Sequence, residues 1–148
     1  MHFAITARVL GVLLMIFSLT MLTPIIVAWI YGEQTSQTFL SAFAITLLVG
    51  LLFWFPAKNK KGELRTRDGF IVTVFFWLVL STFGALPLML SEAPNLSFMD
   101  ALFESISGLT TTGATVISGL DDLPKSILYY RQQLQWLGGI GIVVIAVA

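Results

Sequence analysis

The sequence predicts an all-α protein that crosses a membrane several times, and three observations carry this prediction. Of the 148 residues, 57% are hydrophobic and only 11% are charged, whereas soluble domains carry about a quarter charged residues. The mean hydropathy is +0.90. Apolar segments that are long enough for membrane-crossing helices alternate with short polar links. A lipid bilayer is therefore the expected environment of this chain.

Composition also argues against several classes of function. The formal net charge is zero and no Lys/Arg-rich face is apparent, so nucleic acid is not an expected partner. The chain has no cysteine and one histidine, His2, which excludes disulfides, thiolate metal sites and histidine-based metal clusters. The apolar segments hold no paired carboxylates for acid–base chemistry. We therefore do not expect an enzyme.

The first two predicted spans form an N-terminal hairpin. Residues 9–31 contain no charge, and a helix of this length spans a hydrocarbon core of roughly 30 Å. A signal peptide with Arg8 as its basic flank is the alternative, although the segment is longer than such a peptide needs and lacks a convincing cleavage site. The polar link 32–37 leads to the second predicted span, residues 38–55.

A basic loop, residues 57–69, separates this hairpin from a third predicted span at residues 70–90. It holds five of the eight basic residues: Lys58, Lys60, Lys61, Arg65 and Arg67. Short loops rich in Lys and Arg remain cytoplasmic, so the N-terminus is expected inside and the link 32–37 outside. The loop either serves only to set this topology or also docks a cytosolic partner.

The segment after the third span predicts a helix that is too short to cross a bilayer. Ser97 and Asp100 form the S-x-x-D pattern of a capping box, which starts a helix at about Phe98. The helix is expected to end by residue 108 or 109. Eleven or twelve residues give only about 17 Å of helix. This length favours a re-entrant element, and the apolar segment 123–148 is expected to complete a fourth span.

Between the short helix and the last segment lies "GLTTTGAT", residues 108–115. Non-helical backbone at membrane depth must be buried in protein or line a water-filled cavity. The C-terminal end of a helix carries about half a negative charge, threonine offers hydroxyl oxygens, and Gly113 permits a positive φ that can turn a carbonyl. The loop is therefore either a potassium-channel-like pore loop or a surface turn stabilised by its threonines. The pore-loop interpretation gives two N-terminal transmembrane helices followed by one helix–pore loop–helix repeat.

Four blocks of the sequence together resemble a known family. They are "KGELRTRDGF", "GALP", "FESISGLTTTGAT" and "YRQQLQWLGGIGI", and they occur in this order over nearly the whole chain. The chain resembles the TrkH family, the membrane subunit of bacterial Trk potassium-uptake systems. The resemblance implies that the loop is one quarter of a K⁺ selectivity filter. Carried over by position, Thr111, Thr112 and Gly113 would coordinate the ion. The weaker candidates that would line or support it are Thr110, Ala114 and Thr115.

The resemblance also implies partners and a location. It implies K⁺ as the transported ion without an organic cofactor, a cytosolic nucleotide-binding regulatory subunit, a homodimer of the full-length protein, and the bacterial inner membrane. The family encloses its ion with four repeats, of which this chain holds the first, so we expect it to be the N-terminal part of a longer protein. The expected organisation is a hairpin (1–56), a basic cytoplasmic loop (57–69) and a first repeat (70–148).

Several further residues have two interpretations each. Glu104, on the short helix, either supports the pore by stabilising a cation indirectly or is an outward-facing or hydrogen-bonded carboxylate. Arg131 either braces the filter or extends to the membrane interface. Asp121 and Asp122 either raise the cation concentration at the pore mouth or form a solvated rim. Close helix packing is the expected role of the last glycines. These are Gly138, Gly139 and Gly141.

Two functions follow from these patterns. The first is K⁺ transport through a filter that includes Thr111, Thr112 and Gly113. The alternative is a small polytopic membrane protein with a structural or assembly role, in which the threonine loop is a surface turn.

Overall fold

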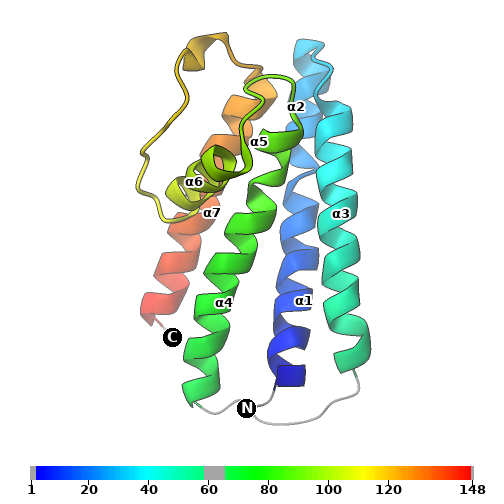
Figure 1. Ribbon diagram of the computed structural model, residues 1–148, viewed down its shortest axis with the longest axis vertical. Coiled ribbons are helices and arrows are strands. Elements are labelled where there is room, and N and C mark those ends of the chain that lie inside the picture. The colour runs from blue at the N-terminus through cyan, green and yellow to red at the C-terminus, as the bar shows by residue number, and fades with distance from the viewer. Residues whose placement is uncertain (1–2, 59–65, 148) are drawn as a thin grey trace.

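The computed structural model describes residues 3–58 and 66–147. Every regular element within these ranges is helical, which confirms the predicted all-α fold (Figure 1). In chain order the elements are α1 (Phe3–Thr20), α2 (Thr23–Tyr31), α3 (Ser36–Trp54), η1 (Phe55–Ala57), α4 (Thr66–Gly84), α5 (Leu86–Leu90), α6 (Phe98–Leu109), η2 (Leu120–Asp122) and α7 (Lys125–Val147). Most of the predicted cytoplasmic loop, residues 59–65, and His2 lie outside the described residues.

Three helical segments of the described chain are long and apolar enough to cross a membrane. They are Ala4–Tyr31, Ser36–Ala57 and Gly69–Leu90, and they match the first three predicted spans. The predicted fourth span, α7, is not among them. Its 23 residues are long enough, at about 34 Å, but its first half carries Lys125, Arg131 and three glutamines. Two of these polar side chains, Arg131 and Gln133, pack against the rest of the protein, as described below, while Lys125 and Gln132 are exposed.

The first span contains a break that the sequence analysis does not predict. Helix α1 ends at Thr20 and α2 begins at Thr23, with Pro24 in its first turn. Proline has no N–H and its ring clashes with the preceding turn, so a continuous helix is disfavoured here. The peptide carbonyl of Thr20, which residue 24 would normally bond, is therefore available to other donors.

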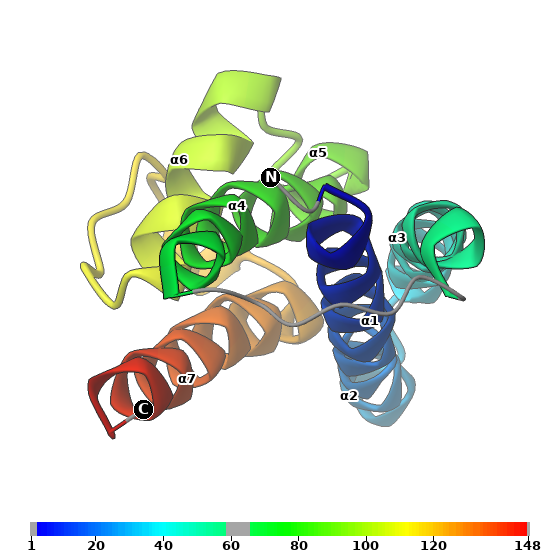
Figure 2. The ribbon, with the colours of Figure 1, turned by 90° about the horizontal axis from the view of Figure 1, so that it is seen from below.

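Helices α1 and α3 pack closely through two glycines. A Cβ atom added to Gly11 would lie 2.7 Å from the carbonyl oxygen of Gly50, and one added to Gly50 would lie 3.0 Å from the carbonyl oxygen of Gly11. Small residues let membrane helices approach in this way. Seen from below, the α1–α3 pair lies on one side of α4 and α6 lies on the other (Figure 2).

Helix α4 ends at Gly84, and α7 supplies the hydrogen bond that is lost there. The Leu88 N–H, which would bond Gly84 in a continuous helix, donates to the carbonyl of Ala85 instead. The fully buried Tyr130 donates its hydroxyl to the carbonyl of Gly84 at 2.8 Å. Its ring also meets that of Phe39 edge-on, with centroids 5.5 Å apart. Tyr130 therefore joins α3, α4 and α7 in the core.

Helix α6 begins as predicted. The Ser97 hydroxyl accepts from the Asp100 N–H at 3.2 Å and donates to the Asp100 carboxylate at 2.7 Å. The helix lies across α4 and α7 near the end of the bundle that carries η2, and the following loop returns to that same end (Figure 1). This is the re-entrant path that its length predicts.

Apart from Leu109, the buried residues of α6 are small or polar, and glycines bring α7 close to them. A Cβ added to Gly108 would lie 3.0 Å from the Leu134 Cβ, and one added to Gly138 would overlap the carbonyl of Leu109. The prediction of close packing is confirmed for Gly138. It is not borne out for the other two glycines, where an added Cβ would have only ordinary contacts of 3.8 to 3.9 Å. These glycines are Gly139 and Gly141.

Candidate functional site

The backbone of the threonine loop reverses direction through two left-handed residues. Thr111 has a φ of 58° and Gly113 a φ of 75°. The conformation is unstrained for glycine, but costs a β-branched residue roughly 1–2 kcal/mol. Backbone hydrogen bonds to the end of α6 stabilise this conformation. The Thr111 N–H donates to the carbonyl of Gly108 at 2.9 Å, and the Thr112 N–H donates to the carbonyl of Ser107 at 2.9 Å. A held left-handed threonine is the kind of local strain that occurs at functional sites.

The side chains of the loop are exposed along its whole length, residues 110–116. An added Cβ at Gly113 would meet only one atom within 4 Å, the Gln135 Nε2 at 3.9 Å. The open space means that Gly113 is needed here for its backbone conformation and not for close packing. Residues 110–116 thus form a continuous exposed segment of the described chain.

Two of the threonine hydroxyls are ordered by each other. Thr110 donates its hydroxyl hydrogen to the carbonyl of Ile106 at 2.7 Å. The Thr112 hydroxyl lies 2.8 Å from the Thr110 hydroxyl. Because a hydroxyl has a single hydrogen, Thr112 must be the donor of this pair. Thr112 therefore directs its hydroxyl hydrogen toward Thr110 and leaves its oxygen lone pairs available to accept.

The return leg of the loop is held by a buried carboxylate. One oxygen of Glu104 accepts from the Thr115 hydroxyl at 2.5 Å and from the Val116 N–H at 2.7 Å. Its other oxygen accepts from Arg131, from Nε at 3.0 Å and from Nη2 at 2.8 Å. The Glu104 side chain is 1% exposed and that of Arg131 is 12% exposed. The carboxylate therefore joins α6, the loop and α7. Arg131 contacts the residue that holds the loop, which fits the bracing interpretation and not the extension to the membrane interface.

Ser107 is hydrogen-bonded to the middle of the loop and was not among the site residues predicted from the sequence. Its hydroxyl donates to the carbonyl of Ala114 at 2.6 Å, while its own carbonyl accepts from the N–H groups of Thr112 and Gly113 at 2.9 and 3.3 Å. Ser107 lies three residues after Glu104, so both side chains leave the same face of α6. That spacing, on the helix preceding a threonine loop, is the signal that could have identified it.

Comparison with known proteins identifies the family of this chain. The family model for TrkH, described as a cation transport protein, matches residues 35–148. The chain belongs to the TrkH family. The family resemblance carried by the four sequence blocks is thereby confirmed, and so is the predicted architecture of a polytopic membrane protein.

Relatives of this TrkH-family chain are potassium uptake proteins. It is 52% identical to the Trk system potassium uptake protein TrkH of Escherichia coli over 148 residues, which are all of this chain and 31% of that protein. The TrkH protein of Halomonas elongata is 59% identical over 141 residues, 95% of this chain and 29% of that protein. The chain therefore spans about a third of the length of these relatives.

A solved TrkH structure has the same fold. The crystal structure of the potassium transporter TrkH from Vibrio parahaemolyticus matches with a TM-score of 0.95 at 52% identity, and the match covers 99% of this chain and 31% of that one. The re-entrant α6 and its exposed loop are therefore part of a fold that occurs in a TrkH-family transporter.

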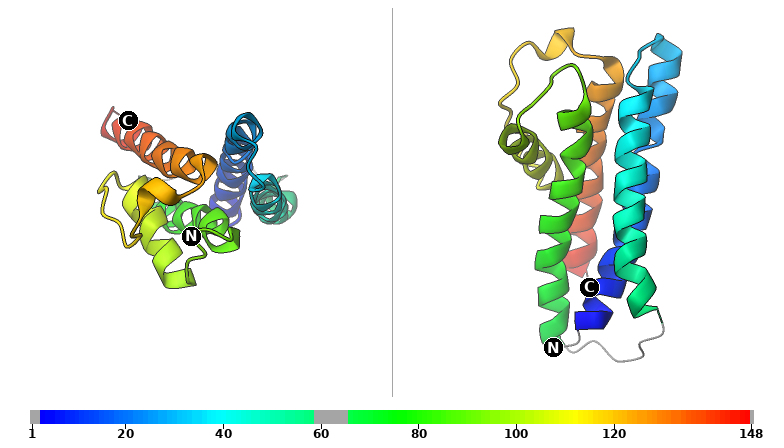
Figure 3. Two further views of the ribbon diagram at one scale, coloured as in Figure 1. Left: turned by 90° about the horizontal axis from the view of Figure 1, so that it is seen from above. Right: turned by 45° about the vertical axis from the view of Figure 1, so that its right-hand side comes forward.

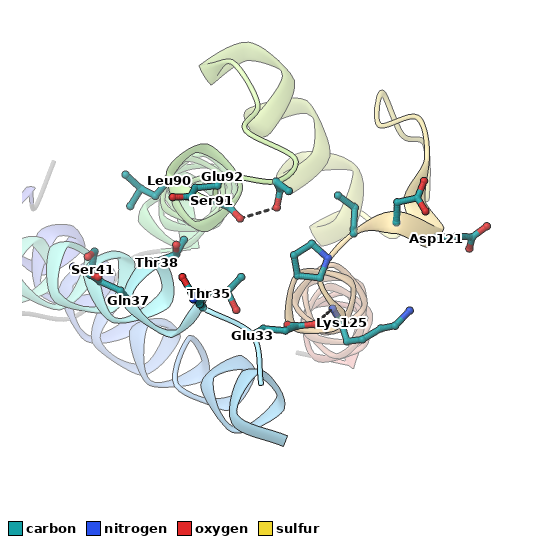
Figure 4. A pocket seen from close by; sticks show the side chains of 15 residues that line it. Glu33, Thr35, Gln37, Thr38, Ser41, Leu90, Ser91, Glu92, Asp121 and Lys125 are labelled. Carbon is teal, nitrogen blue, oxygen red and sulfur yellow. Dashed lines mark hydrogen bonds between the residues drawn. The ribbon is translucent and has the colours of Figure 1, made fainter. Parts of the chain in front are cut away.

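The acidic pair of η2 lies apart from the threonine loop in this TrkH-family chain. Asp121 and Asp122 are exposed and line an open cavity of about 810 Å³ at the η2 end of the bundle. Glu33 and Glu92 line the same cavity (Figure 4). The geometry fits both interpretations of the pair, because exposed carboxylates at a mouth both attract cations and remain solvated.

Proposed function

We propose that this chain supplies one wall of the selectivity filter of a potassium-transporting membrane subunit. The observation that carries the proposal is the form of the threonine loop. It follows a re-entrant helix, turns through left-handed residues at Thr111 and Gly113, and is exposed throughout residues 110–116. The chain spans about a third of its relatives, whose names describe potassium uptake.

The chemistry of the proposed wall is replacement of the ion's hydration shell. Carbonyl oxygens of residues 111–113 and the Thr112 hydroxyl would coordinate K⁺, as backbone carbonyls do in potassium-channel filters. The C-terminal end of α6, which has no basic residue in its last turn, adds a partial negative charge behind the loop. Thr110, Ala114 and Thr115 would support these positions, and Glu104 with Arg131 would hold the return leg.

The proposal includes a topology and partners. The hairpin (1–56), the basic loop (57–69) and the first repeat (70–148) would lie in the bacterial inner membrane with the N-terminus and the basic loop cytoplasmic. Five of eight basic residues in that loop support this orientation. Further repeats would supply the other walls. By family resemblance, the full-length protein would be a homodimer that binds a cytosolic nucleotide-binding regulatory subunit, and it would be a transporter and not an enzyme.

The test is K⁺ uptake by transport-deficient cells that express the complete reading frame. Gly113→Ser places a side chain at a φ of 75° and costs roughly 1–2 kcal/mol of backbone strain. Relief of that strain would turn the carbonyl away from the ion. We expect K⁺ uptake and the K⁺/Na⁺ preference to fall roughly tenfold, the factor that about 1.4 kcal/mol produces.

Gly119→Ser is the matched control, because Gly119 has a φ of 70° but lies outside the filter positions. It should lower stability similarly and leave the ion preference unchanged. If Gly113→Ser leaves both uptake and preference at the wild-type level, the filter assignment is wrong. If the wild-type protein itself restores no K⁺ uptake, the structural or assembly role becomes the better interpretation.

A further inference from the structure

The break between α1 and α2 is joined to α7 by a polar contact inside the bundle. The Gln133 side chain, which is only 9% exposed, donates its amide to the carbonyl of Thr20 at 2.8 Å. That carbonyl lacks its usual backbone partner because residue 24 is proline. The Thr23 hydroxyl lies 2.8 Å from both the Thr20 carbonyl and the Gln133 Oε1. The buried Gln133 side chain thus supplies a hydrogen bond to the Thr20 carbonyl, which the helix break leaves without its backbone donor.

A second contact joins the link after α2 to the start of α7. One carboxylate oxygen of Glu33 accepts from the Lys125 N–H at 2.5 Å, and the other accepts from the N–H and the hydroxyl of Ser126 at 3.0 and 2.6 Å. The first N–H groups of a helix have no partner within it, so Glu33 caps α7 from a distant part of the chain. The Ser126 hydroxyl gives its one hydrogen to Glu33, so Thr35, 2.6 Å away, must donate to Ser126.

These contacts lie on one face of α7, and the filter contacts lie on another. Ser126, Tyr130 and Gln133 follow the i, i+4, i+7 spacing of a single helix face, and all three contact the hairpin or the core beside it. Arg131 and Gly138 face α6, where they meet Glu104 and Leu109. Figure 3 shows α2 beside the first turns of α7 and α6 on the other side of α7.

Because α7 is a rigid helix, a shift of its hairpin face also shifts the face that contacts α6. If α7 rotates or slides against the hairpin, Arg131 moves relative to Glu104, and Glu104 holds Thr115 and Val116 directly. Discrimination between cations depends on the size of the site or on the number and field strength of its oxygens, and both change when the loop is displaced. The hairpin contacts therefore act on the loop without touching it.

We propose that the N-terminal hairpin α1–α3 sets the position of α7, and that Gln133 and Glu33 are positioning residues for the filter. The proposal rests on the proposed function of the threonine loop and adds a role for the hairpin. In this proposal the hairpin contributes to the K⁺/Na⁺ preference and does not only anchor the chain in the membrane.

The experiment compares Gln133→Leu with Gln132→Leu in the complete protein, expressed in transport-deficient cells. Leucine keeps the size of glutamine and removes both hydrogen-bonding groups. Gln132 is the preceding residue, is exposed, and lies off the hairpin face. We expect Gln133→Leu to lower the K⁺/Na⁺ preference about two- to tenfold, the range that loss of a net hydrogen bond allows, and to raise the KM for K⁺. Gln132→Leu should do neither.

The amount of protein in the membrane is measured alongside, because a merely structural residue would change that amount and not the ion preference. An unchanged preference for Gln133→Leu at normal protein amount would overturn the proposal. If Gln133→Leu is lost from the membrane, Thr23→Val decides, since it keeps the side-chain shape and removes only the hydroxyl. A lowered preference for Thr23→Val supports the proposal, and an unchanged one overturns it.

Gly113→Ser is measured in parallel to separate this proposal from the one on which it rests. If Gly113→Ser alters the ion preference while Gln133→Leu does not, the filter stands and the positioning role fails. If neither substitution alters it, the assignment of the filter fails first.

Discussion

The α1–α3 contact and the α6–α7 contact both use glycine to bring two backbones together, but only the second adds buried charge. Gly11 and Gly50 meet in the first contact, and no ion pair occurs between the described residues of those two helices. The second contact contains the buried pair of Glu104 and Arg131 beside the close approach of Gly138. Close packing alone is enough to hold two membrane helices together, whereas a buried ion pair also determines where a loop must lie.

The largest expected effect comes from breaking that ion pair. Arg131→Gln would leave the buried Glu104 carboxylate without its cation, and removing one partner of a buried pair costs about 3–5 kcal/mol. We expect K⁺ uptake to be lost and the thermal unfolding temperature of the purified complete protein to fall. Lys125→Gln is the control, because it removes an exposed positive charge from the same helix.

A second variant tests whether the charge or the shape of this contact matters. Combining Glu104→Gln with Arg131→Gln leaves no uncompensated buried charge, so it should recover part of the lost unfolding temperature. It should not restore the ion preference, because the acceptor that holds Thr115 is weaker. An Arg131→Gln protein with the unfolding temperature and uptake of Lys125→Gln would show that the pair does not hold the loop.

A smaller effect is expected from filling the two glycine contacts. Gly138→Ala would push α7 away from the carbonyl of Leu109, and Gly11→Ala would separate α1 from α3. Overpacking of this kind typically costs about 1–3 kcal/mol. We expect both substitutions to lower the unfolding temperature, but only Gly138→Ala to lower the K⁺/Na⁺ preference strongly. Both quantities are measured on the complete protein.

Gly139→Ala is the control for this comparison, because its added Cβ would meet only Thr111 Cγ2 at 3.9 Å. It should leave stability nearly unchanged. Equal losses of ion preference in Gly11→Ala and Gly138→Ala would remove the distinction between the two contacts. Gly11 lies about 15 Å along the helix from the α1–α2 break, so it tests the hairpin away from the contacts with α7.

The sequence alone predicted most of the fold, because its signals are local. Apolar length located the first three spans, and the Ser97–Asp100 pattern located the start of α6. The break at residues 21–22 was missed although Pro24 is a local signal for it. Helix α7, the predicted fourth span, is less apolar than the first three spans because its first half carries polar residues. Two of them, Arg131 and Gln133, contact other helices.

The candidate site was predictable only in part, because its supports join residues far apart in the chain. The threonine loop and both Glu104 and Arg131 were identified from local patterns, but their mutual contact spans 27 positions. The contact of Gln133 with Thr20 spans 113 positions. Helical periodicity says which residues share a face, but it does not say which helix that face meets.

The smallest expected effect concerns the pH dependence of the cap on α7. Burial raises the pKa of Glu33, but hydrogen bonds from Ser126 and Lys125 outweigh it, so the pKa lies below its ordinary value of 4.5. A group whose pKa is lower in the folded state stabilises that state above its unfolded pKa and loses this contribution as the pH falls through its folded pKa. Glu33 should therefore stabilise the protein fully at neutral pH and lose that contribution below about pH 4.5.

The measurement is the difference in unfolding temperature between wild type and Glu33→Gln as a function of pH. At pH 7 the wild type should be more stable by up to about 1 kcal/mol, the usual contribution of a partly exposed charged cap. The difference should shrink as Glu33 is protonated. The same cavity is lined by Glu92, Asp121, Asp122 and the side chain of Lys125. These residues are present in both proteins, so the comparison isolates Glu33. A difference that grows toward low pH would show that the Glu33 charge opposes the contact between the hairpin and α7, and the two faces of that helix would then not be held in the way proposed.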